Sequence, residues 1–157
     1  SLAARQYAID HAQRIKGLGK NSWGMSASIS PTTGYSGHYG SYPIGAGYKL
    51  LEDGTVAPYG ALSFLPFTPE ASISALKYMY TIPGLVGKYG LYDAYSFKTK
   101  AKGNQPWIAK SYLGIDKGLV LLMFENYSSQ LIWKLLHQNI YIQKGLKTLE
   151  FAQVTKI

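Results

Sequence analysis

Apolar residues recur at near-helical spacing in several stretches of this 157-residue chain. The first stretch, residues 2–16, carries Leu2, Ile9 and Ile15 in this pattern, and glycines follow it as common helix stops. A second, shorter stretch covers residues 58–65 and begins with a proline, which suits the first turn of a helix. The pattern therefore predicts two helices in the first half of the chain.

Three more helices are predicted in the remainder. A Thr-Pro-Glu sequence at 68–70 opens a helix over residues 69–80, with the threonine oxygen accepting the first free amide. Asp116 is the predicted N-cap of the longest helix, residues 114–138, whose apolar run covers every face and predicts a central, buried position. Residues 140–151 form the last helix. Because β-branched alternation is nearly absent, we predict an all-α chain.

Two long loops, residues 23–43 and 83–112, separate these helices and are rich in tyrosine, tryptophan and glycine. Long loops in compact domains are usually functional or disordered, and a disordered segment would be poor in aromatic residues. A pyranose ring offers one apolar face for stacking and a rim of hydroxyl groups for hydrogen bonds. The loops therefore predict a sugar site, while packing against the helices is the alternative for many individual rings.

Composition removes several classes of function. The chain has 16 Lys and Arg residues against 8 Asp and Glu, a formal net charge of +8. These basic residues are scattered, and charge is the one feature that favours nucleic acid, so we predict no nucleic-acid partner. The absence of cysteine excludes a disulfide framework. The longest apolar run, residues 119–124, is too short for a membrane span, and the histidines lack metal-binding spacing, so no cofactor is predicted.

The few carboxyl groups stand in unusual surroundings. Asp53, Asp93, Asp116 and Glu125 lie in stretches rich in Gly, Tyr or Leu instead of on charged faces. A carboxyl group in such a place needs a partner or lines a cavity. Helix capping and turn formation explain each aspartate taken alone. Taken together, they suit glycoside hydrolysis, which needs one protonated and one ionised carboxyl group.

A series of motifs follows in chain order: WGMSAS, GYSGHYGSYP, DGTVAPYGALSFLPFTPE, ALKYMY, GKYGLYDAYSF, YLGIDKG, MFENY, LIWKLL and NIYIQKGL. In order and spacing this series resembles the glycoamylase-like family, which is related to bacterial endo-β-1,2-glucanases and to a domain of cyclic β-1,2-glucan synthases. The resemblance covers nearly the whole chain.

The resemblance implies that residues 1–157 are the C-terminal part of an (α/α)6 toroid, with the N-terminal helices on a separate chain or a longer precursor. It implies an inverting hydrolase of β-glucan, above all β-1,2-glucan, located in the periplasm or at the cell surface. It assigns the second catalytic carboxylate to Asp116 and places the general acid outside this chain. Together with the aromatic and carboxylate patterns, it selects as substrate contacts Trp23, His38, Tyr39, Tyr42, Asp53, Tyr92, Asp93, Trp107, Glu125 and Asn126.

The chain departs from the family pattern in three places. Ile29 stands where the family commonly has Asp, Lys117 stands where it has Gln, and ENYSSQ replaces ENYRTG with the loss of an Arg. A cation at Lys117 would lower the pKa of the adjacent Asp116 and favour a base over an acid. These differences leave two alternatives open: a catalytically silent glycan-binding paralogue with the same aromatic cleft, and a basic surface-interaction module.

Overall fold

The computed structural model describes residues 2–38, 53–100 and 105–152. Its helices are α1 (Leu2–Asp10), α2 (Tyr59–Leu62), α3 (Pro69–Tyr80), α4 (Gly114–Ser128), α5 (Leu131–Gln138) and α6 (Ile140–Thr148). Its strands are β1 (Ser28–Ser30), β2 (Gly34–Ser36), β3 (Thr55–Val56), β4 (Val86–Gly87), β5 (Gly90–Leu91), β6 (Ala94–Lys100) and β7 (Pro106–Ala109).

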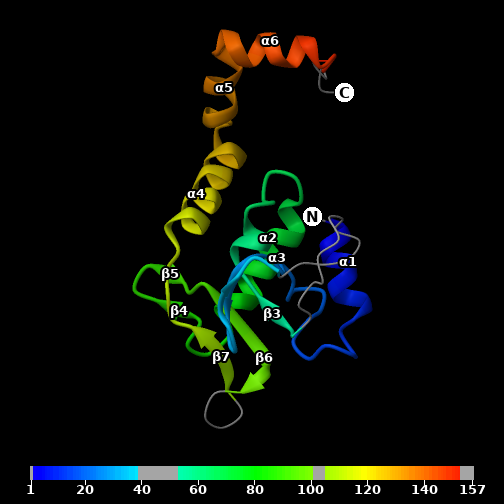
Figure 1. The fold of residues 1–157 in the computed structure, drawn as a ribbon, viewed down its shortest axis with the longest axis vertical. Coiled ribbons are helices and arrows are strands. Elements are labelled where there is room, and N and C mark those ends of the chain that lie inside the picture. The colour runs from blue at the N-terminus through cyan, green and yellow to red at the C-terminus, as the bar shows by residue number, and fades with distance from the viewer. Residues whose placement is uncertain (1, 39–52, 101–104, 153–157) are drawn as a thin grey trace.

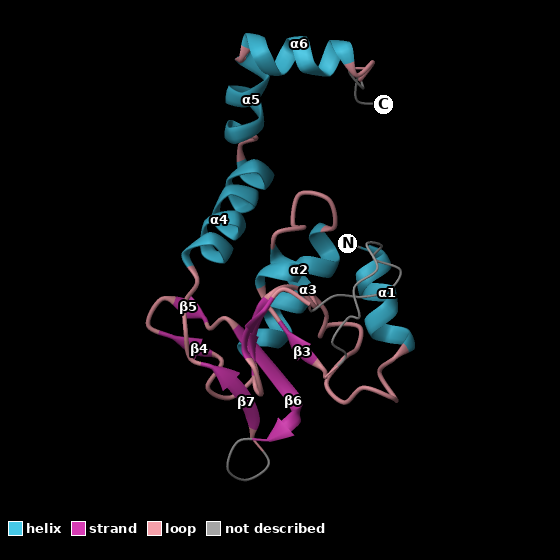
Figure 2. Cartoon of the chain, in the orientation of Figure 1, coloured by secondary structure: helices cyan, strands magenta, loops and turns pink. Residues whose placement is uncertain are grey.

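These elements form a mixed body and a helical arm (Figure 1). We call α1 to α3 with the strands the body, and α4 to α6 the arm. Figure 2 shows the strands gathered in one half of the body, with α2 and α3 beside them and the arm extending away. The chain is therefore helical with small sheets, so the all-α prediction is wrong for the strand-containing segments.

The strands escaped the sequence pattern because they are short and carry few β-branched residues. The three-stranded sheet has the order β3-β6-β7, and all its pairs are antiparallel. In its central strand the consecutive residues Ala94, Tyr95 and Ser96 are all buried, so the alternation of polar and apolar positions is lost. Two further hairpins, β1-β2 and β4-β5, complete the strand pairing in the described parts of the chain.

Helix α3 occupies the predicted residues 69–80. Ser72, Ala75 and Met79 form its buried face, at the spacing of successive helical turns. The predicted capping role of Thr68 is wrong, because its side chain receives no hydrogen bond from the helix amides. Its Oγ1 atom instead donates to the carbonyl oxygen of Phe64 and shares a hydrogen bond with Ser72.

The predicted helix 114–138 is divided into α4 and α5. Gln130 has a left-handed backbone with φ of 60°, which ends the regular helix between them. The N-cap of α4 is Leu113, whose backbone is extended, and Asp116 lies within the first turn. The predicted N-cap role of Asp116 is therefore wrong, and its carboxyl group is left for another contact.

The arm is much more exposed than its apolar sequence predicts. Leu121 is 70% exposed, and other large apolar side chains of α4 to α6 also face solvent in the described chain. The hydrophobic core instead lies in the body, around Trp23, Met79, Leu85 and Tyr95. The prediction that residues 114–138 are buried does not hold within this chain.

Two glycines bring the loop after Trp23 against helix α2. A Cβ atom on Gly60 would lie 2.5 Å from the carbonyl oxygen of Gly24, which is a backbone atom that cannot rotate away. That same oxygen accepts a hydrogen bond of 3.2 Å from the backbone N–H of Ala57. The contact fixes the first turn of α2, and with it Tyr59, against the loop.

We expect the substitution Gly60→Ala to lower the free energy of unfolding by about 2 kcal/mol or more, because the added methyl group displaces backbone. Chemical denaturation of the full-length protein measures this change. Gly19→Ala is the matched control, since a Cβ there meets open space. Equal stability of the two variants would contradict the close packing described here.

Candidate functional site

A pocket of about 250 Å³ lies where the start of α4 meets the body. Its walls come from α2, α3, α4 and the segment that contains the β4-β5 hairpin. Figure 1 shows this hairpin close to the first turn of α4. Two carboxyl groups, an ammonium group and several aromatic rings share its surface. These lining residues are Tyr59, Tyr80, Tyr89, Tyr92, Asp93, Asp116 and Lys117.

Asp93 and Asp116 form a buried pair of carboxyl groups in the pocket lining. They are only 5% and 9% exposed. Oδ2 of Asp93 accepts a hydrogen bond of 2.7 Å from the backbone N–H of Ile29. Oδ1 of Asp93 and Oδ2 of Asp116 are also buried, and no amide, hydroxyl or ammonium group in the described residues donates to them. The pair thus has fewer donors than two ionised carboxylates require.

This shortage of donors favours a proton on the pair. Burial, a hydrogen bond shared with Asp93 and the charge of Asp93 together raise the pKa of Asp116 from 3.8 to about 6. The charge of Lys117 opposes the rise. Two carboxyl groups that share a hydrogen bond hold one proton between them until the pH rises through the raised pKa. Asp116 therefore exchanges a proton close to neutral pH, as a general acid or base does.

The ammonium group of Lys117 connects α4 to the segment that carries Asp93. Its Nζ atom donates a hydrogen bond to the carbonyl oxygen of Leu91, two residues before Asp93. It also lies 5.5 Å from the centroid of the Tyr112 ring, within the range of a cation–π contact. Burial lowers the pKa of Lys117, and the charges of Asp93 and Asp116 oppose this change.

Tyr59 holds the loop before β1 against the pocket. Its hydroxyl group donates to the carbonyl oxygen of Ala27 at 3.0 Å and shares a hydrogen bond of 2.7 Å with Ser26. Burial raises the pKa of the Tyr59 hydroxyl, so this group stays neutral over the physiological range. Since the loop leads directly to Ile29, Tyr59 also supports the amide that binds Asp93.

Three tyrosines form an aromatic wall beside Lys117. The ring centroids of Tyr92 and Tyr112 lie 4.9 Å apart, and those of Tyr89 and Tyr112 lie 5.4 Å apart in an edge-to-face arrangement. Gly87 makes room for this wall, because a Cβ atom there would lie 2.2 Å from the Tyr112 hydroxyl oxygen. A side chain at position 87 would therefore displace the outer ends of the Tyr92 and Tyr112 rings.

The structure brings together Tyr92, Asp93 and Asp116 from the predicted set. Trp23 has a different position, because its side chain is 0% exposed and belongs to the hydrophobic core. A ring without exposed surface cannot stack on a sugar. The structure therefore gives Trp23 a packing role in place of the predicted sugar contact.

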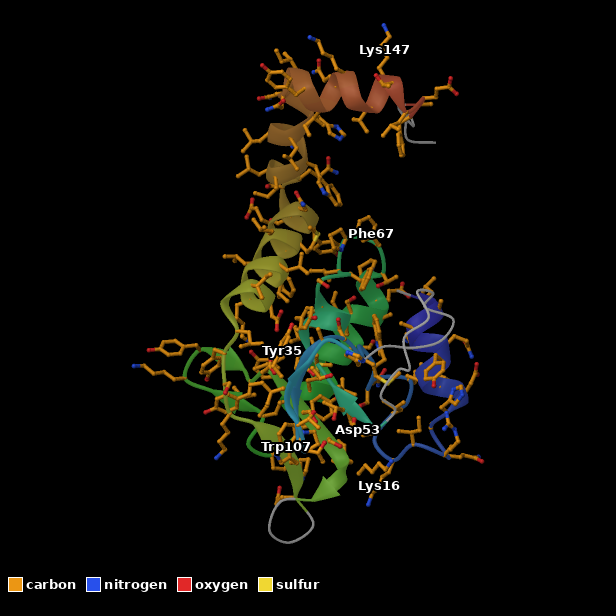
Figure 3. All side chains as sticks on the ribbon, viewed as in Figure 1. Lys16, Tyr35, Asp53, Phe67, Trp107 and Lys147 are labelled. Carbon is orange, nitrogen blue, oxygen red and sulfur yellow. The ribbon has the colours of Figure 1, made fainter. Side chains whose placement is uncertain are left out.

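Asp53 and Trp107 are not among the residues that line the pocket. Figure 3 labels both side chains on the body, near the three-stranded sheet. Oδ1 of Asp53 accepts a hydrogen bond of 2.9 Å from the backbone N–H of Thr55, which is a local turn contact. Trp107 is half-buried on β7, opposite Ser96 of β6. Neither residue therefore belongs to the pocket that holds Asp93 and Asp116.

Glu125 and Asn126 also contribute to local structure in the arm. Oδ1 of Asn126 accepts a hydrogen bond of 3.1 Å from the backbone N–H of Trp133, and the side chain is almost fully buried. Glu125 accepts a hydrogen bond from the Ser129 hydroxyl group. These contacts stabilise the junction of α4 and α5, at a distance along α4 from Asp116.

The loop that carries His38 is described only up to that residue. The His38 side chain is exposed, and its backbone N–H donates to the Ser36 hydroxyl oxygen at 3.2 Å. Tyr39 and Tyr42 lie outside the described residues. The predicted contacts of these three side chains with sugar thus stay predictions.

Tyr59, Tyr89 and Tyr112 were missed as site residues in the sequence. Tyr112 stands four residues before Asp116, and Tyr89 stands four residues before Asp93. Nearness along the chain to the two selected aspartates was therefore the signal for both. For Tyr59 the sequence signal was only its position beside a predicted helix start. The contact between the loop before β1 and α2, which places Tyr59 at the pocket, is seen only in the structure.

Among the described residues, no group of three or more His, Asp or Glu side chains is placed to hold a metal ion. In the same parts of the chain, no helix has the length and apolar character needed to cross a membrane.

We expect Asp116→Asn to raise the free energy of unfolding at pH 7.5 by up to about 2 kcal/mol, because it removes a carboxylate that is costly to bury. The folded pKa of about 6 exceeds the unfolded value of 3.8. The stabilising effect of a protonated Asp116 is thus complete below pH 3.8 and is lost as the pH rises through about 6. The increase in the free energy of unfolding caused by Asp116→Asn should therefore disappear near pH 4.

Denaturation of the full-length protein at a series of pH values tests this expectation. Asp10→Asn is the control, since Asp10 is exposed and only accepts a local hydrogen bond from Gln6. A stability difference that does not change with pH would contradict the buried pair.

Comparison with known proteins assigns this chain to a family. The Glycoamylase family model, described as "Putative glucoamylase", matches residues 1–140. The chain is 30% identical over 148 residues to the exo beta-1,2-glucooligosaccharide sophorohydrolase (non-reducing end) of Parabacteroides distasonis. The aligned region covers 93% of this chain and 19% of that protein.

Two solved structures show the same fold. The endo-beta-1,2-glucanase from Chitinophaga pinensis, in complex with sophorotriose and glucose, is 37% identical with a TM-score of 0.75, over 94% of this chain and 32% of that chain. The beta-1,2-glucanase from Parabacteroides distasonis is 30% identical with a TM-score of 0.73, over 92% of this chain and 19% of that chain. The present chain thus spans about a fifth to a third of these relatives.

These matches confirm the resemblance that the ordered motifs indicated. They cover most of the described residues, including both carboxyl groups of the pocket. The chain belongs to the Glycoamylase family.

Proposed function

We propose that the protein is a glycoside hydrolase that acts on β-glucan, and above all on β-1,2-glucan. The observation that carries this proposal is the buried pair of Asp93 and Asp116 in a pocket walled by tyrosines. The names of the relatives, an endo-β-1,2-glucanase and a sophorohydrolase, support the choice of substrate. The activity belongs to the whole protein, and its proposed location in the periplasm or at the cell surface rests on the family alone.

Asp116 is the general base of the proposed inverting reaction. Above a pH of about 6 its carboxylate is ionised and takes a proton from a water molecule. The water oxygen then attacks the anomeric carbon from the face opposite the leaving oxygen, which is protonated by a general acid as the glycosidic bond breaks. Asp93, held by the amide of Ile29, orients the Asp116 carboxyl group.

Asp93 itself is badly placed to be the general acid. The acid and the base of an inverting glycosidase lie about 6.5–9.5 Å apart, because a water molecule fits between the base and the sugar. Asp93 and Asp116 instead share a hydrogen bond. We therefore place the general acid in a part of the protein outside this chain.

The tyrosines supply the proposed sugar contacts. Tyr80 and Tyr89 are exposed at the pocket, and Tyr89 has 67% of its surface free. Their rings would stack on apolar pyranose faces, and their hydroxyl groups would bind sugar hydroxyls. Tyr92 lies deeper, next to Asp93, and would contact the sugar closest to the reacting bond.

A catalytically silent glycan-binding paralogue is the second candidate, and Lys117 is the observation that favours it. A cation beside the carboxyl pair stabilises the ionised form of Asp116 and so weakens it as a base. Such a protein would retain the aromatic wall and bind glucan without cleaving it.

We also propose that the N-terminal part of the same domain, on a precursor or a separate chain, covers the arm and completes an (α/α)6 toroid. The arm exposes a series of large apolar side chains to solvent, which is rare for a surface without a partner. They include Leu119, Leu121, Leu122, Leu131, Leu135, Leu136, Ile140 and Tyr141. The relatives supply the needed length, since this chain spans only 19–32% of them.

The first test is product release from a panel of β-glucans by the full-length protein. We expect oligosaccharides from β-1,2-glucan, and a loss of at least about a hundredfold in the rate with Asp116→Asn, since one acid or base group contributes about 10²–10⁴. Asp10→Asn serves as the carboxyl control outside the pocket. Binding of glucan without release of oligosaccharides would contradict the proposed hydrolase activity and support the silent paralogue.

A second test concerns the covered arm. In the full-length protein we expect Leu121→Asp to lower the free energy of unfolding by about 2 kcal/mol or more, because a charge would enter an apolar interface. At a solvent-exposed position a substitution to Asp costs less than about 0.5 kcal/mol. Gln13→Asp, at an exposed site of the body, provides that reference. A cost for Leu121→Asp as small as this reference would show that the arm faces water.

A further inference from the structure

Lys117 stands out among the lysines because its charged end is fixed inside the pocket. Its Nζ atom donates to the carbonyl oxygen of Leu91 and lies over the ring of Tyr112. Its side chain is half-buried, whereas Lys110, a few residues earlier, is exposed. Ordering a long side chain in this way costs conformational entropy, so its contacts must repay that cost.

The surroundings of the ammonium group offer only one source of negative charge among the described residues. Asp93, from the segment after β5, and Asp116, from α4, are the charged groups that act on it. The other titratable groups of the pocket lining are the phenols of Tyr59 on α2, Tyr80 on α3, and Tyr89 and Tyr92 by the β4-β5 hairpin, and Tyr112 supplies the ring beneath it. Phenols are neutral at physiological pH. The lysine and the carboxyl pair therefore balance each other electrostatically.

We propose that Lys117 is a positioning residue that holds Asp93 against Asp116 and supplies the positive charge that stabilises the ionised form of Asp116 in this buried pair. The hydrogen bond to Leu91 fixes the backbone two residues before Asp93 to the first turn of α4. Below a pH of about 6 the pair then contains one proton and one negative charge, opposite one cation, and above this pH the same cation stabilises the ionised Asp116. This inference rests on the proposed function of Asp116 as a base, which must be ionised to act.

Two separable effects follow from this arrangement. The hydrogen bond is a geometric link that any donor of suitable length could provide. The charge acts over a longer range and favours the ionised form of Asp116, as the direction of its pKa change indicates. Lys117→Gln retains a donor without charge, Lys117→Met retains only the stem, and Lys117→Arg retains the charge.

The experiment measures kcat/KM on β-1,2-glucan between pH 4.5 and 9 for the full-length protein and these three variants. We expect both neutral variants to move the acidic limb upward by about one pH unit, with about a tenfold loss at pH 5.5 and less than about a threefold loss at pH 8.5. Lys117→Arg should retain the original limb. Lys110→Gln is the control for loss of a nearby exposed lysine.

A second measurement does not depend on activity. The ¹³C chemical shift of the Asp116 carboxyl carbon, assigned by its absence in Asp116→Asn, reports the ionisation of this group directly in the same protein. We expect its midpoint to rise in Lys117→Gln and Lys117→Met and to stay unchanged in Lys117→Arg. If the wild-type protein cleaves no glucan, the proposed function fails, and this titration still decides the role of Lys117.

Unchanged midpoints and superimposable pH profiles in the two neutral variants would overturn the proposal. A second result would also overturn the proposal: Lys117→Gln has the wild-type pH profile, while Lys117→Met loses activity at every pH. That pattern would assign Lys117 a hydrogen-bonding role alone.

Discussion

Two carboxyl groups that are buried side by side cannot both be charged without a large electrostatic penalty. Asp93 and Asp116 are in this situation, and one amide, that of Ile29, relieves part of the cost for Asp93. Burial and the neighbouring Asp93 raise the pKa of Asp116 to about 6, so it keeps its proton to a higher pH than an exposed aspartate does. The polar groups around the pocket lower the electrostatic cost of burying these two carboxyl groups.

The surrounding scaffold meets the constraint by fixing backbone atoms. Tyr59 binds the loop that leads to Ile29, and the contact between Gly24 and Gly60 holds the start of α2 against that loop. The carboxyl pair therefore depends on packing in the body, although Asp116 itself belongs to the arm. A change in the body can alter the acidity of Asp116 without touching it.

The departure at Ile29 has a small effect for the same reason. The contact with Asp93 uses the backbone N–H of Ile29, which every residue except proline provides. The side chain at this position can change while the amide remains. Lys117 differs, because its own ammonium group reaches the pocket.

The sequence was informative where structure follows from local rules. Pro69 and the spacing of Ser72, Ala75 and Met79 were sufficient for α3, and the unusual surroundings of Asp93 and Asp116 were sufficient to select both carboxyl groups. Local rules failed for Thr68, whose hydroxyl group has a better partner in the preceding turn than in the helix it precedes.

Other features depended on contacts between distant segments. Trp23 looks like a loop aromatic in the sequence, and only the packing of the loop on the core shows that its ring is inaccessible. The strands of residues 83–112 depend on pairing, for example of Tyr95 with Val56 and Ile108, and not on their own composition. The burial of α4 was inferred from its apolar run, which the described chain alone does not cover.

The connection between the two aspartates is a β-hairpin with both ends anchored. Ala94 pairs with Ala109 at its base, and the backbone N–H of Asp93 donates to the carbonyl oxygen of Ser111 at 3.0 Å. These contacts fix the spacing of the two carboxyl-bearing segments whatever the length of the hairpin beyond them. A change of length or composition farther along this hairpin would therefore leave the two carboxyl-bearing segments at the same spacing.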